Sequence, residues 1–187
     1  MHHFGCTVGI YGSFACSARA ARSEAGHELC WWETGPLCER RYQIGEQWYN
    51  LRPDALAGYR VGSQHFRFWL EWDRGTMNAR DLLVKCSSYA HYIASRQWAR
   101  ERSMPPALLC IAPDIAQERR ILRMARVGGL THMPELVLWT STELLLNEYG
   151  PHAPIWLKHI LQDSQEGQPD GLRRQKIFAP VPTHMMH

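Results

Sequence analysis

The amino-acid sequence predicts an α/β domain built around a mixed β-sheet. Helix and strand patterns follow one another in the order helix, three strands, helix, strand, helix, strand, helix. The dipeptide Gly62-Ser63 indicates an antiparallel hairpin, and a strand that follows a crossover helix supplies a parallel neighbour. A chain of 187 residues suits one domain, so we expect a single domain over residues 1–162 and a loosely ordered extension over residues 163–187.

The first part of the chain supplies one helix and three strands. Residues 7–25 are small and mainly apolar, with Val8, Tyr11 and Ala18 near helical spacing, which predicts the first helix. Short apolar or alternating runs bounded by Gly or Pro predict the strands. The polar segment 40–51 contains Gly45 and predicts a loop. The three strands are expected at residues 28–33, 53–61 and 64–73.

The second part alternates helices with strands. Residues 78–102 predict a long helix, because Leu82, Cys86 and Ile93 recur at helical spacing. The continuous apolar run 107–112 is typical of a strand that is covered on both faces. The remaining elements are a helix capped by Asp114 that runs to about Arg126, a strand at 136–140, and a short helix opened by Ser141 with Glu143 in its first turn.

Composition excludes several classes of protein. With 45% hydrophobic and 21% charged residues, the chain is neither disordered nor collagen-like. No stretch approaches the ~20 uncharged apolar residues of a membrane span, and the first residues lack a signal-peptide pattern, so we expect a cytoplasmic protein without membrane contact. The six cysteines form no CxxC pair, which predicts free thiols, and no GxSxG motif of a serine hydrolase is present.

Positive charge is concentrated in the middle of the chain, although the net charge is only +3. Residues 60–126 hold twelve Lys or Arg against six Asp or Glu. Arg119, Arg120 and Arg123 form a stripe on one predicted helix, which is a candidate face for phosphate groups. A solvated helix face without a ligand explains the same stripe equally well.

Three carboxylates are expected to meet at one edge of the sheet. Asp54 opens one strand of the predicted hairpin, and Glu71 and Asp73 close its partner strand on a shared face. Acids crowded together repel, so a divalent cation is their natural counter-charge, and Mg²⁺ favours such oxygen ligands. Two alternatives remain: Glu71 and Asp73 belong to the solvent face of an edge strand, or Arg74 neutralises the acids without metal.

These residues resemble the motifs of the PD-(D/E)XK nuclease superfamily. Pro53-Asp54 matches the PD element and Glu71 the acid on the following strand, whereas Asp73 stands where that superfamily usually has lysine. Lys85 and Tyr89 resemble the QxxxY element on the next helix, with Lys85 in place of glutamine. The resemblance implies a restriction-endonuclease-like mixed sheet with an αβββαβ core flanked by helices, and metal-dependent cleavage of DNA.

A second resemblance covers roughly residues 14–140. Four segments resemble the replication-relaxation family of plasmids and integrative elements. Their sequences are GHELCWWE, WYNLRPDALAGYR, RFWLEWDRGTM and LLVKCSSYAHY. That family is associated with replication and mobilisation of such DNA, which implies DNA and other replication or mobilisation proteins as partners. Its longer members begin with a winged-helix domain, which we do not expect in this chain.

The resemblances imply three hypotheses. In the first, a Mg²⁺-dependent nuclease or nickase uses Asp54, Glu71 and Asp73 as metal ligands, Lys85 to polarise water or stabilise developing charge, and Arg74 to hold the scissile phosphate. In the second, a catalytically inactive nuclease-fold module binds DNA or docks to a protein, and Arg74 replaces the metal. In the third, the protein is a scaffold that never touches DNA. The residues expected to contact nucleic acid are Arg74, Tyr89, Arg119, Arg120 and Arg123.

Overall fold

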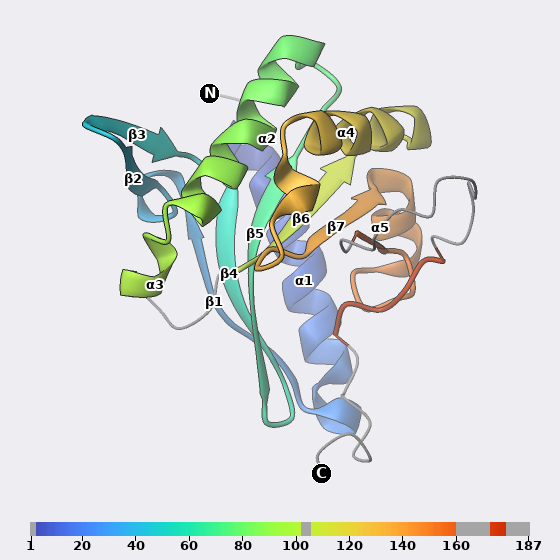
Figure 1. Ribbon diagram of the computed structural model, residues 1–187. Helices are drawn as coiled ribbons and strands as arrows, with labels where there is room; N and C mark the ends of the chain where they lie inside the picture. The colour runs from blue at the N-terminus through green and yellow to red at the C-terminus, as the bar shows by residue number, and fades with distance from the viewer. Residues whose placement is uncertain (1–2, 102–105, 160–172, 179–187) are drawn as a thin grey trace.

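A six-stranded mixed sheet forms the centre of the protein (Figure 1). This computed structural model describes residues 3–101, 106–159 and 173–178. Along the sheet the strand order is β1-β4-β5-β6-β7-β8, which confirms the predicted α/β class. The strands are β1 (His27–Thr34), β4 (Ala55–Val61), β5 (Gln64–Trp72), β6 (Ala107–Ala112), β7 (Leu138–Thr142) and β8 (Leu157–His159).

The sheet combines the two expected kinds of pairing. Strands β1, β4 and β5 form an antiparallel meander, and the Gly62-Ser63 turn joins β4 to β5 with Val61 opposite Gln64, as predicted. Strands β5, β6 and β7 are parallel neighbours, because helices connect them, and β8 adds an antiparallel edge. Strand β5 is therefore an inner strand, so its acids do not lie on the edge strand that one alternative required.

Helices cover both faces of the sheet (Figure 1). One face packs against α2 and α4, and the opposite face packs against α1. Asn78 and Asp114 begin α2 and α4 by accepting the backbone N–H of the residue three positions later, which confirms the predicted cap at Asp114. The helices are α1 (His3–Ala25), α2 (Ala79–Ala94), α3 (Trp98–Glu101), α4 (Ile115–Val127) and α5 (Glu143–Tyr149), with 3₁₀ turns η1 (Gly35–Leu37) and η2 (Leu130–His132).

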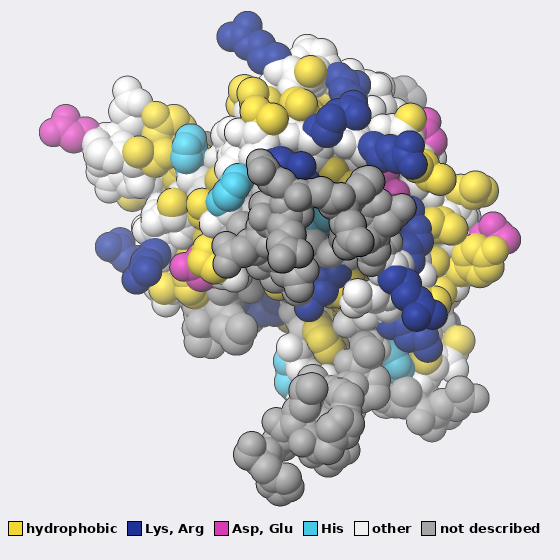
Figure 2. Space-filling model, turned by 45° about the vertical axis from the view of Figure 1, so that its right-hand side comes forward, with side chains coloured by type: hydrophobic (Ala, Val, Ile, Leu, Met, Phe, Trp, Pro, Cys, Tyr) yellow, Lys and Arg dark blue, Asp and Glu magenta, His cyan; other side chains and the backbone are white. Residues whose placement is uncertain are grey.

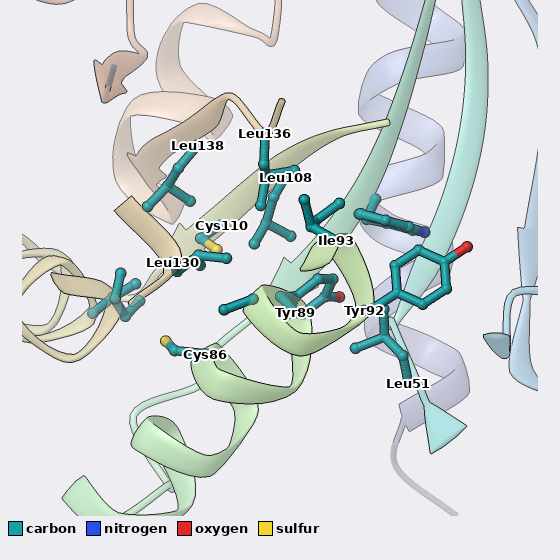
Figure 3. Packing of buried hydrophobic residues seen from close by; sticks show 14 of the residues in the cluster. Leu51, Cys86, Tyr89, Tyr92, Ile93, Leu108, Cys110, Leu130, Leu136 and Leu138 are labelled. Atoms are coloured by element: carbon teal, nitrogen blue, oxygen red, sulfur yellow. The ribbon is translucent and has the colours of Figure 1, made fainter. Parts of the chain in front are cut away.

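The core between the sheet and the α2/α4 layer is rich in aromatic residues. Trp69 of β5 contacts Tyr89 and Tyr92 of α2, with ring centroids 5.4 Å apart in both pairs. Leu108 and Cys110 of β6 complete this layer from the sheet side (Figure 3). Burial of these side chains fixes the rotation of α2, and with it the direction of every polar group on its inner face.

The core on the α1 side follows a helical stripe that differs from the predicted one. Ile10, Phe14 and Ala18 are buried at intervals of four residues, whereas Tyr11 is 43% exposed. Phe14 packs against Phe68 of β5, with ring centroids 5.3 Å apart. The sequence prediction placed Tyr11 on the buried face because small alanines gave the helix no clear apolar side.

The segment 40–51 is a β-hairpin, so the prediction of a loop is wrong. Strands β2 (Arg40–Ile44) and β3 (Gln47–Leu51) pair antiparallel in a second, two-stranded sheet. Tyr42 and Leu51 are buried in the α2 core and fix the register, and Gly45 takes the positive φ of 57° that the tight turn requires. Polar composition concealed the strands because most of their other side chains face solvent.

The boundaries of two further elements differ from those predicted. The long helix expected over 78–102 is interrupted after Ala94, where Arg96 adopts a positive φ of 54° and Ser95 bonds the Tyr92 carbonyl with its hydroxyl. The expected strand at 136–140 lies two residues later as β7, and Thr142 rather than Ser141 caps the helix that follows. Strand β8 was not predicted.

Part of the C-terminal extension is described, at residues 173–178. Gln175 forms two backbone hydrogen bonds with Trp156, and Phe178 stacks on Tyr59 with ring centroids 4.2 Å apart. These six residues are thus packed on the domain, while most of the expected extension lies outside the described residues. The described cysteines Cys16, Cys30, Cys38, Cys86 and Cys110 are free thiols, and within the described ranges no helix is long and apolar enough to cross a membrane.

Candidate functional site

Strand pairing brings Asp54 to the end of β5, as the sequence predicted. The backbone N–H of Asp54 donates to the Leu70 carbonyl (3.1 Å), and the backbone N–H of Trp72 donates to Oδ2 of Asp54 (2.8 Å). Asp54 therefore lies beside the segment that carries Glu71. The two carboxylates are close enough that the charge of Asp54 helps to raise the pKa of Glu71.

Glu71 is the centre of a closed polar cluster between β5 and α2. Its side chain is only 8% exposed and forms an ion pair, through Oε2, with the ammonium of Lys85. The hydroxyl of Tyr89 donates to Oε1 of the same carboxylate. Because Lys85 and Tyr89 lie one helical turn apart on α2, a single helix face supplies both partners.

The charges in this cluster are coupled. The pKa of Glu71 is raised to about 7, because burial, aided by the charge of Asp54, outweighs the opposite effects of Lys85 and Tyr89. Burial lowers the pKa of Lys85, but the carboxylates of Glu71 and Asp54 outweigh that effect and hold it above its ordinary value. Lys85 is therefore the permanent cation of the site, and its charge stabilises the ionised form of Glu71.

Asp73 is turned toward α4 instead of toward Asp54. It is 4% exposed, and its two oxygens accept hydrogen bonds from the Gln117 side chain and the backbone N–H of Gly75. Gly75 adopts a positive φ of 75°, which closes the turn over Asp73. Sequence analysis missed Gln117, although it lies one helical turn before Ile121 on the inner face of α4, where a polar residue requires a partner.

The donor set, as folded, does not fit a magnesium ion. Glu71 is bound to an ammonium and a hydroxyl, both oxygens of Asp73 accept N–H groups, and one oxygen of Asp54 accepts a backbone N–H. Across residues 3–101, 106–159 and 173–178, no three His, Cys, Asp or Glu side chains are grouped so that they could hold a metal ion. Lys85 occupies the side of Glu71 where a cation would bind.

The cluster lies at one end of a pocket between α2, α4 and the sheet. Apart from the polar residues Glu71, Asp73, Lys85 and Tyr89, the pocket is lined by apolar side chains and cysteines. Such a lining keeps water away from the ion pair and offers little to a phosphate group. The remaining lining residues are Met77, Leu82, Cys86, Leu108, Cys110, Ile121, Ala125, Leu130 and Leu138.

Two residues expected to contact ligand have other positions. Arg74 is exposed on the turn after β5, and the cation that pairs with Glu71 is Lys85. Tyr89 is only 1% exposed and faces Glu71, which leaves it almost no surface for a nucleic acid.

The arginines of α4 remain a candidate phosphate-binding face. Arg119, Arg123 and Arg126 are exposed, whereas Arg120 is half-buried and donates to the side-chain oxygen Oε1 of Gln117 (3.4 Å). The exposed arginines recur at i, i+4 and i+7, so they follow one side of the helix. Figure 2 shows several groups of Lys and Arg side chains on the viewed side of the molecule, with few Asp and Glu side chains between them.

A second buried ionic cluster joins α4 to the C-terminal segment. Glu118 is 1% exposed and forms a two-point ion pair with Arg174, with N–O distances of 2.6 and 3.2 Å. Thr140 of β7 donates to the same carboxylate (2.9 Å), and His159 of β8 lies 3.3 Å from that hydroxyl. Sequence analysis missed this cluster because its members are far apart in the chain.

Comparison with known protein families identifies a match. A family model described as replication-relaxation matches residues 1–108, which include β1, β4, β5, α2 and the whole Glu71 cluster. No curated protein matches the chain.

Proposed function

Because the chain belongs to the replication-relaxation family, we propose that it is a DNA-binding accessory module that acts in replication or mobilisation of a plasmid or integrative element. The observation that carries a non-catalytic role is the ion pair between Lys85 and Glu71. An ammonium fixed on a buried carboxylate supplies the neutralisation that a divalent cation supplies in a metal-dependent phosphodiesterase. The pair stabilises the fold where a nuclease would need an open, hydrated site.

The DNA interface in this proposal is the exposed side of α4. Arg119 and Arg123 present guanidinium groups to solvent, and Arg120 is held by Gln117 next to them. Guanidinium groups bind phosphate oxygens in pairs and remain charged at every physiological pH. Such contacts give affinity without reading the base sequence, so a partner protein is expected to supply specificity.

A metal-dependent nuclease or nickase is the second candidate, and one observation favours it. Asp54, Glu71 and Lys85, three of the four groups that the first hypothesis assigned to the catalytic site, lie at one end of β4 and β5 beside α2. Asp54 and Glu71 would hold Mg²⁺, which would supply activation of water, at the position beside Glu71 that Lys85 occupies here. In this candidate Mg²⁺ raises the melting temperature of the wild type, and Asp54→Asn abolishes the rise.

The test compares binding and cleavage in one set of proteins. We expect wild type to bind a fluorescent duplex, with affinity falling steeply as salt rises, and Arg119→Gln/Arg123→Gln to reduce the logarithmic salt slope by about 2. The control Arg19→Gln/Arg100→Gln removes two exposed arginines from α1 and α3. Salt-independent binding, or equal loss in both double variants, contradicts the α4 interface. Nicking of supercoiled plasmid by wild type with Mg²⁺, but not by Asp54→Asn, replaces the accessory role with the nuclease.

A further inference from the structure

The hairpin of β2 and β3 projects from the body of the domain, at the upper left of Figure 1. It forms its own two-stranded sheet and is not part of the central one. Helix α2 contacts β3 on one side and α4 on the other, so the hairpin and the arginines of α4 are separate surfaces. Its strands are therefore free to present an outer face that the rest of the fold does not use.

The inner face of the hairpin anchors it rigidly. Tyr42 and Leu51 are 1% and 2% exposed in the α2 core, and the Tyr42 ring packs edge-on against Tyr92 at 5.9 Å. Tyr49, opposite Tyr42, stacks on it with ring centroids 5.5 Å apart. A surface held by this aromatic packing loses little conformational freedom when it binds a ligand.

The outer face combines one cation, one indole and two amides. Arg41 is paired with Asn50 and Gln43 with Trp48, and all four side chains are exposed on the same side of the hairpin. The guanidinium of Arg41 lies 4.4 Å from the centre of the Trp48 ring. Trp48 nevertheless remains 49% exposed. These two cross-strand pairs hold no carboxylate and carry one positive charge, and Glu46 lies beyond them in the turn of the hairpin.

We propose that this outer face binds the unpaired bases of single-stranded DNA, an inference that rests on the proposed DNA-binding role and adds a second contact to it. Trp48 offers a ring on which a base stacks, and Arg41 beside it is placed for the adjoining phosphate. Gln43 and Asn50 supply both donors and acceptors for base edges. A polyanion with exposed aromatic bases complements this combination, whereas a duplex hides its base faces.

The test measures single-stranded and duplex binding separately, with fluorescent oligothymidylate and a fluorescent duplex. We expect Trp48→Ala to weaken oligothymidylate binding roughly 10-fold and to leave duplex affinity unchanged. Arg41→Gln should weaken oligothymidylate binding by a smaller factor. Tyr149→Ala is the matched control, because Tyr149 is 57% exposed on α5 and belongs to neither surface.

The outcomes separate this inference from the proposed function. If wild type binds duplex while Trp48→Ala and Arg41→Gln bind oligothymidylate like wild type, the hairpin inference fails and the α4 interface stands. If wild type binds neither DNA, both fail. If Trp48→Ala instead converts a dimer into a monomer in light scattering, a second copy of the chain covers this face and the single-strand inference is overturned.

Discussion

Lys85 of α2 and Glu71 of β5 form an ion pair at the interface between helix and sheet, with 28% and 8% of their side chains exposed. Tyr89, one turn later on the helix, donates to the same carboxylate. The sequence resemblance implied a metal-binding role for Glu71 and a catalytic role for Lys85, whereas in the structure the two side chains are paired with each other. The same residue pattern is thus compatible with a structural role. Whether Lys85 stays paired with Glu71 distinguishes the proposed accessory module from the metal-dependent nuclease.

Lys85→Met is expected to destabilise the fold most at alkaline pH. Without Lys85 the pKa of Glu71 rises further above about 7, so at about pH 8 the folded variant must either bury an unpaired carboxylate or bind a proton that the unfolded chain does not bind, a loss of up to about 3 kcal/mol. Since the pKa of Glu71 is already about 7, the carboxyl is protonated at about pH 5.5 and the loss should be smaller there. Urea unfolding at the two pH values measures the difference.

The control for this prediction is Arg80→Met, which removes an exposed cation from the same helix. It should change the free energy of unfolding by less than about 0.5 kcal/mol at either pH. Equal losses for Lys85→Met at the two pH values would show that the variant acts through packing and not through the charge of Glu71.

The buried carboxylate of Glu118 also holds the C-terminal segment 173–178 on the domain through Arg174. Arg174→Gln removes the cation from the buried Glu118, which keeps its hydrogen bond from Thr140, and should cost about 2–3 kcal/mol. Residues 173–178 should then become sensitive to a protease, because Arg174 also bonds the Ile155 carbonyl (2.6 Å). Arg173→Gln, an exposed neighbour, is the control. Similar protease resistance in both variants would show that Phe178 packing alone holds the segment.

Acid should destabilise the protein through two half-buried histidines. Burial lowers the pKa of His152 and of His159 to about 4, with His27 and Lys176 contributing at His152. The unfolded chain then binds more protons than the folded one, so stability is full above about pH 6.5 and falls as pH drops toward 4. We expect each histidine to contribute on the order of 1–3 kcal/mol to this loss.

Thermal unfolding across that range checks the prediction. His159→Gln, which keeps a polar group beside Thr140, should flatten the pH dependence, whereas the exposed His65→Gln should not. An unchanged profile in His159→Gln would assign the acid sensitivity to His152, which accepts or donates the 2.5 Å hydrogen bond with Tyr59.

Local sequence patterns predicted the order of the main elements because each depends on neighbours in the chain. Helical spacing at Leu82, Cys86 and Ile93 and the cap at Asp114 correspond to α2 and α4. The β2–β3 hairpin was missed because only Tyr42 and Leu51 are buried in it, and their burial depends on α2, which is distant in sequence. Periodicity cannot report a contact of that kind.

The same limit applies to the candidate site. Antiparallel register placed Asp54 beside Glu71 correctly, because the short turn at Gly62-Ser63 fixes which residues face each other. The partner of each acid could not be predicted in this way. Lys85 rather than Arg74 neutralises Glu71, and Gln117 binds Asp73, because the rotation of α2 and the position of α4 are set by packing across the whole core.

A glycine in the centre of the sheet provides a test of that packing. Gly58 of β4 lies opposite Trp31 of β1, and a Cβ atom at Gly58 would be only 2.2 Å from Nε1 of the indole. Gly58→Ala should therefore destabilise the fold by about 1–3 kcal/mol, since the indole must leave its place. In Gly58→Ala/Trp31→Leu the smaller side chain removes the clash, so the double variant should lose less stability than the sum of the losses in the two single variants.

Gly12→Ala is the control, because a Cβ there meets no atom within 4 Å and alanine favours helix α1 by up to about 1 kcal/mol. Strictly additive losses in urea unfolding would mean that Gly58 is required by the backbone of β4 and not by the indole of Trp31.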